Sequence, residues 1–157
     1  MSVSYWDTSC VIALYTPEEI SNAVERLASA QKGPIHSSAI LEFEMIFAIH
    51  AKESRREIPP GSSAKVLAKF TSDLAAGRFV LSPLGSDIKS CAQSVANAVH
   101  RSKEAVLLRT LDGIHISTAI QLRCSEFITA DTRMAVAAEL SGLKVRLPKN
   151  AKRLRKA

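Results

Sequence analysis

The stretch FITADTRMAVAAELSGLKVR, residues 127–146, contains a complete strand–helix–strand pattern. Phe127 to Thr129 are strand-forming residues, Thr132 to Leu140 repeat apolar side chains at helical spacing, and Gly142 follows as a helix-ending glycine. Residues 144–146 form the next strand candidate. A helix between two short strands is typical of parallel pairing, because the helix returns the chain to the starting end of the sheet.

The same alternation extends toward the N-terminus. Residues 3–6, 35–37 and 79–81 have the composition of short strands. Helices are predicted between them at 8–15, 17–32, 38–52, 64–76, 86–108 and 110–123, with a break near Arg101 dividing the fifth of these into two. The sequence therefore predicts an α/β fold: a short, mostly parallel central sheet of about five strands flanked by helices.

The composition is that of one domain with its own core. The chain has 157 residues, of which 46% are hydrophobic, and this is enough to bury a core without disulfides. Its three cysteines show no metal-ligand spacing and are expected to be small core residues in a reducing compartment. With neither a secretory leader nor an apolar run long enough to span a membrane, the sequence predicts a cytoplasmic protein.

The net charge of +6 is concentrated at the C-terminus. Seven of the 21 basic residues lie from Lys144 onward, where there is no acidic residue. We expect a folded domain at 1–147 and a basic tail at 148–157. Such a tail favours phosphate backbones, although a merely solvated terminus remains an equal alternative. The candidate phosphate-binding residues are Lys149, Lys152, Arg153, Arg155 and Lys156.

Three aspartates lie at or near predicted helix starts. Asp7 and Asp131 also follow predicted strands, and in open α/β sheets ligands bind beyond the carboxyl ends of the strands. Asp112 shares a helix face with Ile116 and Ala119, which should turn its carboxylate inward. Each aspartate taken singly is equally well explained as a helix cap. Their common position in the fold favours a shared acidic site.

Glu44 is harder to explain as a structural residue. Its helix face is otherwise apolar, and an unpaired charge there would be costly, so either a cation compensates it or this face lines a cleft. Glu42, two residues earlier, points about 200° away and is expected on an outer or dimer-facing side. The apolar residues on the face of Glu44 are Ile40, Phe47, Ala48 and Ala51.

Carboxylates without clustered histidine or cysteine are hard oxygen ligands that suit Mg²⁺ or Mn²⁺. Such ions activate water and stabilise the leaving oxygen of a phosphodiester. We therefore predict that Asp7, Glu44, Asp112 and Asp131 are both the catalytic and the metal-binding residues. Four polar residues are candidates for supporting roles, each with a capping or packing alternative, and packing is the favoured interpretation for the histidine: Thr8, Ser38, Thr129 and His115.

Four segments in order, YWDTSCVIALY, SSAILEFEMIFAI, LRTLDGIHISTAIQL and FITADTRMAVAAELSGLKV, resemble the PIN-domain family and, within it, the VapC-type toxins of toxin–antitoxin pairs. The resemblance carries the family's acids onto Asp7, Glu44, Asp112 and Asp131. It implies a Rossmann-like sheet, dependence on Mg²⁺ or Mn²⁺, endonucleolytic cleavage of structured RNA, homodimers, and a small antitoxin that occupies the active-site groove. Two departures from the family are the extra acid Glu42 and the long basic end.

Other functions remain open at this stage. A housekeeping PIN nuclease that matures RNA would carry the same acids, and a non-catalytic RNA-binding PIN-fold domain would be expected to lack some of them. A phosphoryl-accepting receiver domain is disfavoured, because Asp7 has no acidic neighbour. The sequence shows no aromatic platform for stacking single-stranded bases, so recognition is predicted to depend on backbone charge and RNA shape.

Overall fold

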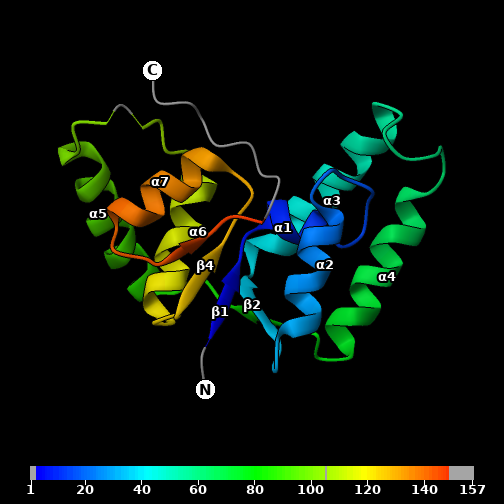
Figure 1. The fold of residues 1–157 in the computed structure, drawn as a ribbon, viewed down its shortest axis with the longest axis horizontal. Helices are drawn as coiled ribbons and strands as arrows, with labels where there is room; N and C mark the ends of the chain where they lie inside the picture. Colours follow the sequence, from blue (N-terminus) through cyan, green and yellow to red (C-terminus); the bar gives the residue numbers. More distant parts are fainter. Residues whose placement is uncertain (1–2, 105, 149–157) are drawn as a thin grey trace.

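The computed structural model describes residues 3–104 and 106–148 (Figure 1). Its sheet has five strands in the order β3-β2-β1-β4-β5, and every neighbouring pair is parallel. The predicted α/β fold with a parallel five-stranded sheet is therefore confirmed. The strands are β1 (Ser4–Trp6), β2 (Ile35–Ser38), β3 (Phe79–Ser82), β4 (Glu126–Ile128) and β5 (Val145–Arg146).

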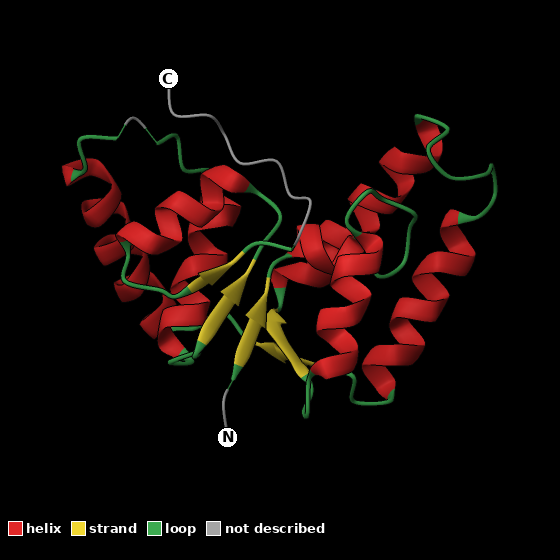
Figure 2. Cartoon of the chain, viewed as in Figure 1, coloured by secondary structure: helices red, strands yellow, loops and turns green. Residues whose placement is uncertain are grey.

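Helices cover both faces of this sheet (Figure 2). In Figure 1, α1 to α4 lie on one side and α5 to α7 on the other. Among the described residues the helices are α1 (Thr8–Ile12), α2 (Ser21–Ala30), α3 (Ile40–Ser54), α4 (Ser63–Ala75), α5 (Ser86–Arg101), α6 (Thr110–Gln121) and α7 (Thr132–Leu140). None of them is long and apolar enough to cross a membrane.

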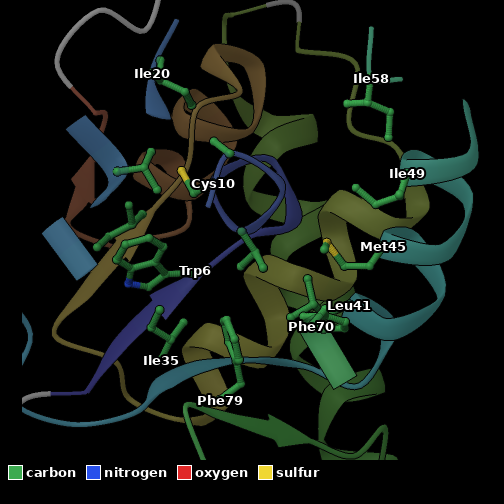
Figure 3. Packing of buried hydrophobic residues seen from close by; sticks show 14 residues of the cluster. Trp6, Cys10, Ile20, Ile35, Leu41, Met45, Ile49, Ile58, Phe70 and Phe79 are labelled. Carbon is green, nitrogen blue, oxygen red and sulfur yellow. The ribbon is translucent and has the colours of Figure 1, made fainter. Parts of the chain in front are cut away.

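Strand alternation divides the core into two clusters, one on each face. Trp6 and Ile128 are paired in register and belong to the cluster with α1 to α4, part of which is drawn in Figure 3. Tyr5 and Phe127 are the adjacent register pair and belong to the cluster with α5 to α7. Because successive strand residues point to opposite faces, Asp7 shares the face of Tyr5.

Some helix boundaries differ from the prediction. Residues 86–101 form a single helix, and the second helix expected before residue 108 is not present in the described part of that segment. Val106 and Leu108 instead pack against the second cluster with the spacing of an extended segment. Helix α2 begins at Ser21 instead of Pro17, since the Ser21 hydroxyl donates to the carbonyls of Ala13 and Thr16 and so stabilises a turn there.

Candidate functional site

The strand order creates a crevice between β1 and β4. These strands are neighbours, but the chain leaves β1 toward β2 and leaves β4 toward β5, in opposite directions. Open parallel sheets bind ligands at such a point, beyond the carboxyl ends of the strands. Asp7 directly follows β1 and Asp131 follows β4, and both line a cleft of about 590 Å³.

All four predicted carboxylates line this cleft, and they come from four different parts of the chain. Asp7 and Asp131 stand at strand ends, Glu44 comes from α3, and Asp112 comes from the first turn of α6. The described residues that complete the lining are Thr8, Ser9, Ile12, Phe43, Phe47, Ala48, Leu111, His115 and Met134. The structure thus brings the predicted acids together, while their catalytic role remains a prediction.

Asp7 is 1% exposed and is held on both carboxylate oxygens. The Ser9 hydroxyl donates to Oδ1 and Oδ2 at 2.7 and 2.9 Å, and the Thr129 hydroxyl donates to Oδ2 at 2.9 Å. Oδ1 also accepts from the Cys10 backbone N–H, so Asp7 caps α1 as well as facing the cleft. Burial raises the pKa of Asp7, and the hydrogen bonds from Ser9, Thr129 and the Cys10 N–H oppose that shift.

Asp131 and Asp112 interact across the cleft. Asp131 caps α7 through Oδ1, which accepts from the backbone N–H groups of Arg133 and Met134 at 2.8 and 3.2 Å. Thr129 accepts from the Asp131 N–H at 3.0 Å and so links Asp131 to Asp7. The pKa of Asp112 is raised, first by burial and then by the negative charge of Asp131. The two carboxylates are therefore close enough to repel each other.

Glu44 lines the cleft, which is one of the two alternatives that the sequence left open for it. Its side chain is 20% exposed, and Oε2 accepts from the Thr8 hydroxyl and lies 2.6 Å from Nε2 of His115. Burial alone would raise the pKa of Glu44, but the contacts with His115 and Thr8 lower it overall. Glu42 is exposed, as expected from the helix geometry.

Part of the apolar face beside Glu44 lines the cleft, which is one of the two alternatives that the sequence left open. Phe47 on this face is 75% exposed, and Phe43 next to Glu44 is 65% exposed. The buried face of α3 is formed by Ile40, Leu41, Met45 and Ile49. Two phenyl rings therefore stand at the mouth of the cleft, where the sequence had suggested no aromatic platform.

His115 is more than a helix-packing residue. It is fully buried, and its Nδ1 lies 2.7 Å from the Tyr5 hydroxyl while Nε2 faces Glu44 and lies 3.2 Å from Thr8. From the sequence a packing role was favoured, because the contact partners of a helix are not visible in its own periodicity. Tyr5 was missed, although strand alternation places it on the same face as Asp7.

Ser38 lies away from the cleft, and Ser9 lines it. Ser38 is fully buried at the end of β2, where it accepts from the Ile40 N–H at 3.5 Å, and it is not among the described residues that line the cleft. Its packing alternative is therefore favoured. Ser9 was missed, yet it binds both oxygens of Asp7 and accepts from the Ala130 N–H at 3.0 Å. A hydroxyl two residues after a capping acid could have suggested it.

The donor set of the cleft suits a hard cation in its chemistry. In residues 3–104 and 106–148, no three acidic, histidine or cysteine side chains are close enough together to hold a metal ion. The hydrogen bonds given to Asp131 fall on Oδ1 and those given to Glu44 fall on Oε2, so one oxygen of each carboxylate is left for another ligand. Carboxylate oxygens of this kind fit Mg²⁺ or Mn²⁺.

Solved structures share this fold at low sequence identity. VapBC2 from Rickettsia felis bound to a promoter DNA fragment is 13% identical, with a TM-score of 0.65 over 94% of this chain and 99% of that chain. FitAcB from Neisseria gonorrhoeae is 19% identical, with a TM-score of 0.64 over 91% and 96% of the two chains. VapC20 from Mycobacterium tuberculosis, described as a sarcin-ricin loop cleaving toxin, is 12% identical, with a TM-score of 0.62 over 85% and 94%.

A comparison with curated protein sequences gives no match. The family model of the PIN domain, however, matches residues 4–140. This match runs from β1 to the end of α7 and includes all four carboxylates of the cleft. The chain therefore belongs to the PIN domain family.

Proposed function

We propose that this protein is a Mg²⁺- or Mn²⁺-dependent endoribonuclease and the toxin component of a toxin–antitoxin pair. The observation that carries the proposal is the convergence of Asp7, Glu44, Asp112 and Asp131 on one cleft of a PIN fold. A capping role explains each aspartate singly, but it does not explain why four carboxylates share one crevice. A buried or half-buried acidic cluster of this kind is typical of a site that binds a cation.

The proposed reaction depends on a divalent cation and on side chains that hold the carboxylates of the cleft in place. A bound Mg²⁺ or Mn²⁺ supplies Lewis acidity, which polarises the phosphodiester and makes water a stronger nucleophile. The negative charges of Asp112 and Asp131 repel each other, and a bound cation would offset this repulsion. Thr129 and Ser9 hold the carboxylate of Asp7 in one orientation, so that little reorganisation is needed when the cation binds.

The proposed substrate is structured RNA. The sarcin-ricin loop, which VapC20 is described as cleaving, supports a folded RNA as the class of target. We also propose that the basic tail contacts RNA phosphates, although Lys149, Lys152, Arg153, Arg155 and Lys156 lie outside the described residues. Arg146, just before the tail, is 3.0 Å from Glu126 in an ion pair, so its charge is partly compensated.

The proposed protein partner is a small antitoxin, and the rim of the cleft supports it. Phe43, Phe47 and Leu111 are 65%, 75% and 45% exposed above an acidic floor. An apolar rim with a negative floor suits a partner segment that carries both apolar and basic side chains. The VapC20 neighbour, which is described as a toxin, agrees with a toxin role. A homodimer follows from the family resemblance and is part of the proposal.

The proposal is tested by incubating purified, partner-free protein with total RNA and Mg²⁺ or Mn²⁺ and mapping the new 5′ ends. A few discrete cleavage sites are expected, and they should disappear in Asp112→Asn. RNA that stays intact with either ion would overturn the nuclease assignment and favour a non-catalytic RNA-binding domain. A housekeeping nuclease would instead cut precursor RNAs and would lack a short neighbouring gene for a DNA-binding protein.

A further inference from the structure

A buried chain of polar groups leads from the centre of the sheet to the cleft. Tyr5 in β1 and His115 in α6 are both fully buried, and their contact joins residues 110 positions apart in the sequence. The Tyr5 hydroxyl lies 2.7 Å from Nδ1 of His115, and Nε2 on the other side of the ring lies 2.6 Å from Oε2 of Glu44. The chain therefore ends on one of the four carboxylates of the cleft.

The hydrogen-bond directions follow from the chemistry of the three groups. A phenol keeps its proton at neutral pH, so the Tyr5 hydroxyl can donate to the ring nitrogen that it contacts. A neutral imidazole has one N–H, and a phenol that donates to Nδ1 leaves that hydrogen on Nε2. His115 then donates to Glu44, as carboxylate acceptors require.

The Tyr5 ring has little freedom to leave this arrangement. It stacks on Phe127 with ring centroids 5.4 Å apart and an interplanar angle of 7°, and it meets His115 edge-on at 5.9 Å. Tyr5 and Phe127 belong to the hydrophobic cluster on this face of the sheet, and His115 is fully buried beside Tyr5. Close packing restricts their rotamers, so the position of the donor N–H is set by the core itself.

The consequence appears at the Glu44 carboxylate. Thr8 and His115 both contact Oε2, which leaves Oε1 as the oxygen available to a cation. We propose that Tyr5 and His115 are a positioning pair that holds Glu44 by Oε2 and presents Oε1 to the divalent ion. This inference rests on the proposed metal-dependent function, and it assigns to two buried residues a role that neither performs by touching the substrate.

A packing role alone explains these residues less well. Polar groups cost free energy when they are buried, and apolar side chains of similar shape would fill the same space. Partners that orient a metal-binding carboxylate typically change metal affinity or activity by about 10–100-fold when they are removed. That range separates a positioning role from a purely structural one.

The test compares Tyr5→Phe, His115→Met and His115→Gln by isothermal calorimetry with Mn²⁺. His115→Met should weaken Mn²⁺ binding by about 10–100-fold, and Tyr5→Phe should weaken it in the same direction by less. His115→Gln places an amide N–H near the position of Nε2 and should recover most of the affinity. Cleavage of one RNA should be restored in Tyr5→Phe at high Mn²⁺, because the defect lies in ion binding.

Ser117→Ala is the matched control. Ser117 is fully buried on the same helix, and its hydroxyl donates to the backbone carbonyl of Gly113. This variant should lose some thermal stability and keep its Mn²⁺ affinity. If Tyr5→Phe and His115→Met also melt earlier but bind Mn²⁺ as wild type does, the pair is only structural and the inference is wrong. A wild-type protein that binds no Mn²⁺ would overturn the proposed function itself, and this inference with it.

Discussion

Among single changes in the cleft, Glu44→Gln best distinguishes an effect on cleavage from an effect on folding stability. Glutamine keeps the volume and the carbonyl acceptor but removes the charge. Glu44 accepts hydrogen bonds on Oε2 from Thr8 and His115. Glu42 supplies a control on the same helix, since it is exposed and points away from the cleft.

The cost in stability follows from those two contacts. A hydrogen bond to a charged group contributes about 1.5–3 kcal/mol and one between neutral groups about 0.5–1.5 kcal/mol, a difference of about 1 kcal/mol for each contact. Glu44→Gln changes two such contacts and should therefore lower the free energy of unfolding by about 2 kcal/mol. Relief of repulsion with the other carboxylates offsets part of this. For a chain of this size the melting temperature should fall by no more than about 4–8 °C.

The effect on cleavage should be much larger than the effect on stability. Electrostatic assistance by a metal ion is worth several kcal/mol, so losing a ligand should slow cleavage by at least about 100-fold at fixed Mg²⁺. The free energy of unfolding of Glu42→Gln should lie within about 0.5 kcal/mol of the wild-type value, and this variant should cleave RNA at the wild-type rate.

The assay is a Mg²⁺ titration of both variants on one RNA, after thermal melting shows that each is folded. If Glu44→Gln cleaves the RNA at the wild-type rate at every Mg²⁺ concentration, Glu44 does not bind the ion. Loss of activity in Glu42→Gln together with retention in Glu44→Gln would mean that the functional face of α3 has been assigned wrongly.

Three further changes have defined outcomes. Excess EDTA should abolish cleavage and added Mn²⁺ should restore it, whereas undiminished cleavage in EDTA would rule out the metal requirement. Removing the residues after Pro148 should weaken RNA binding and flatten its dependence on salt, and an unchanged slope would mean that the tail is only solvated. Burial would raise the pKa of Asp73, but hydrogen bonds from Lys69, Tyr15 and Arg78 lower it from 3.8 to about 2. That contribution to stability is present above pH 3.8 and is lost as the pH falls toward 2, so urea unfolding of Asp73→Asn should differ from wild type near neutral pH and converge with it in acid.

The sequence was sufficient for the fold and for the positions of the aspartates. Segments with the period of a strand alternate with segments with the period of a helix. The residues that follow each predicted strand therefore mark the carboxyl edge of the sheet. Asp7 and Asp131 could therefore be placed at strand ends, and the structure shows that the two strands are neighbours. The helix geometry likewise separated Glu44 from Glu42, because that difference depends only on residues close in sequence.

The contacts between distant elements could not be predicted in this way. The pairing of Tyr5 with His115 depends on how α6 packs on the sheet, which no local pattern reports. The exposure of Phe43 and Phe47 could not be predicted for the same reason: helical spacing shows which side chains share a face, but not what that face contacts. Val106 and Leu108 were assigned to a helix, since two apolar residues are too few to distinguish an extended segment.

The hydrogen bond from Thr129 to Asp7 joins a segment that is synthesised early to one that is synthesised late. It links residues 122 positions apart, and β1 becomes an inner strand only after β4 has paired with it. Because synthesis proceeds from the N-terminus, a nascent chain that stops before β4 lacks Asp131 and leaves β1 with one unpaired edge. The proposed nuclease site is therefore incomplete until nearly all of the described chain has been synthesised.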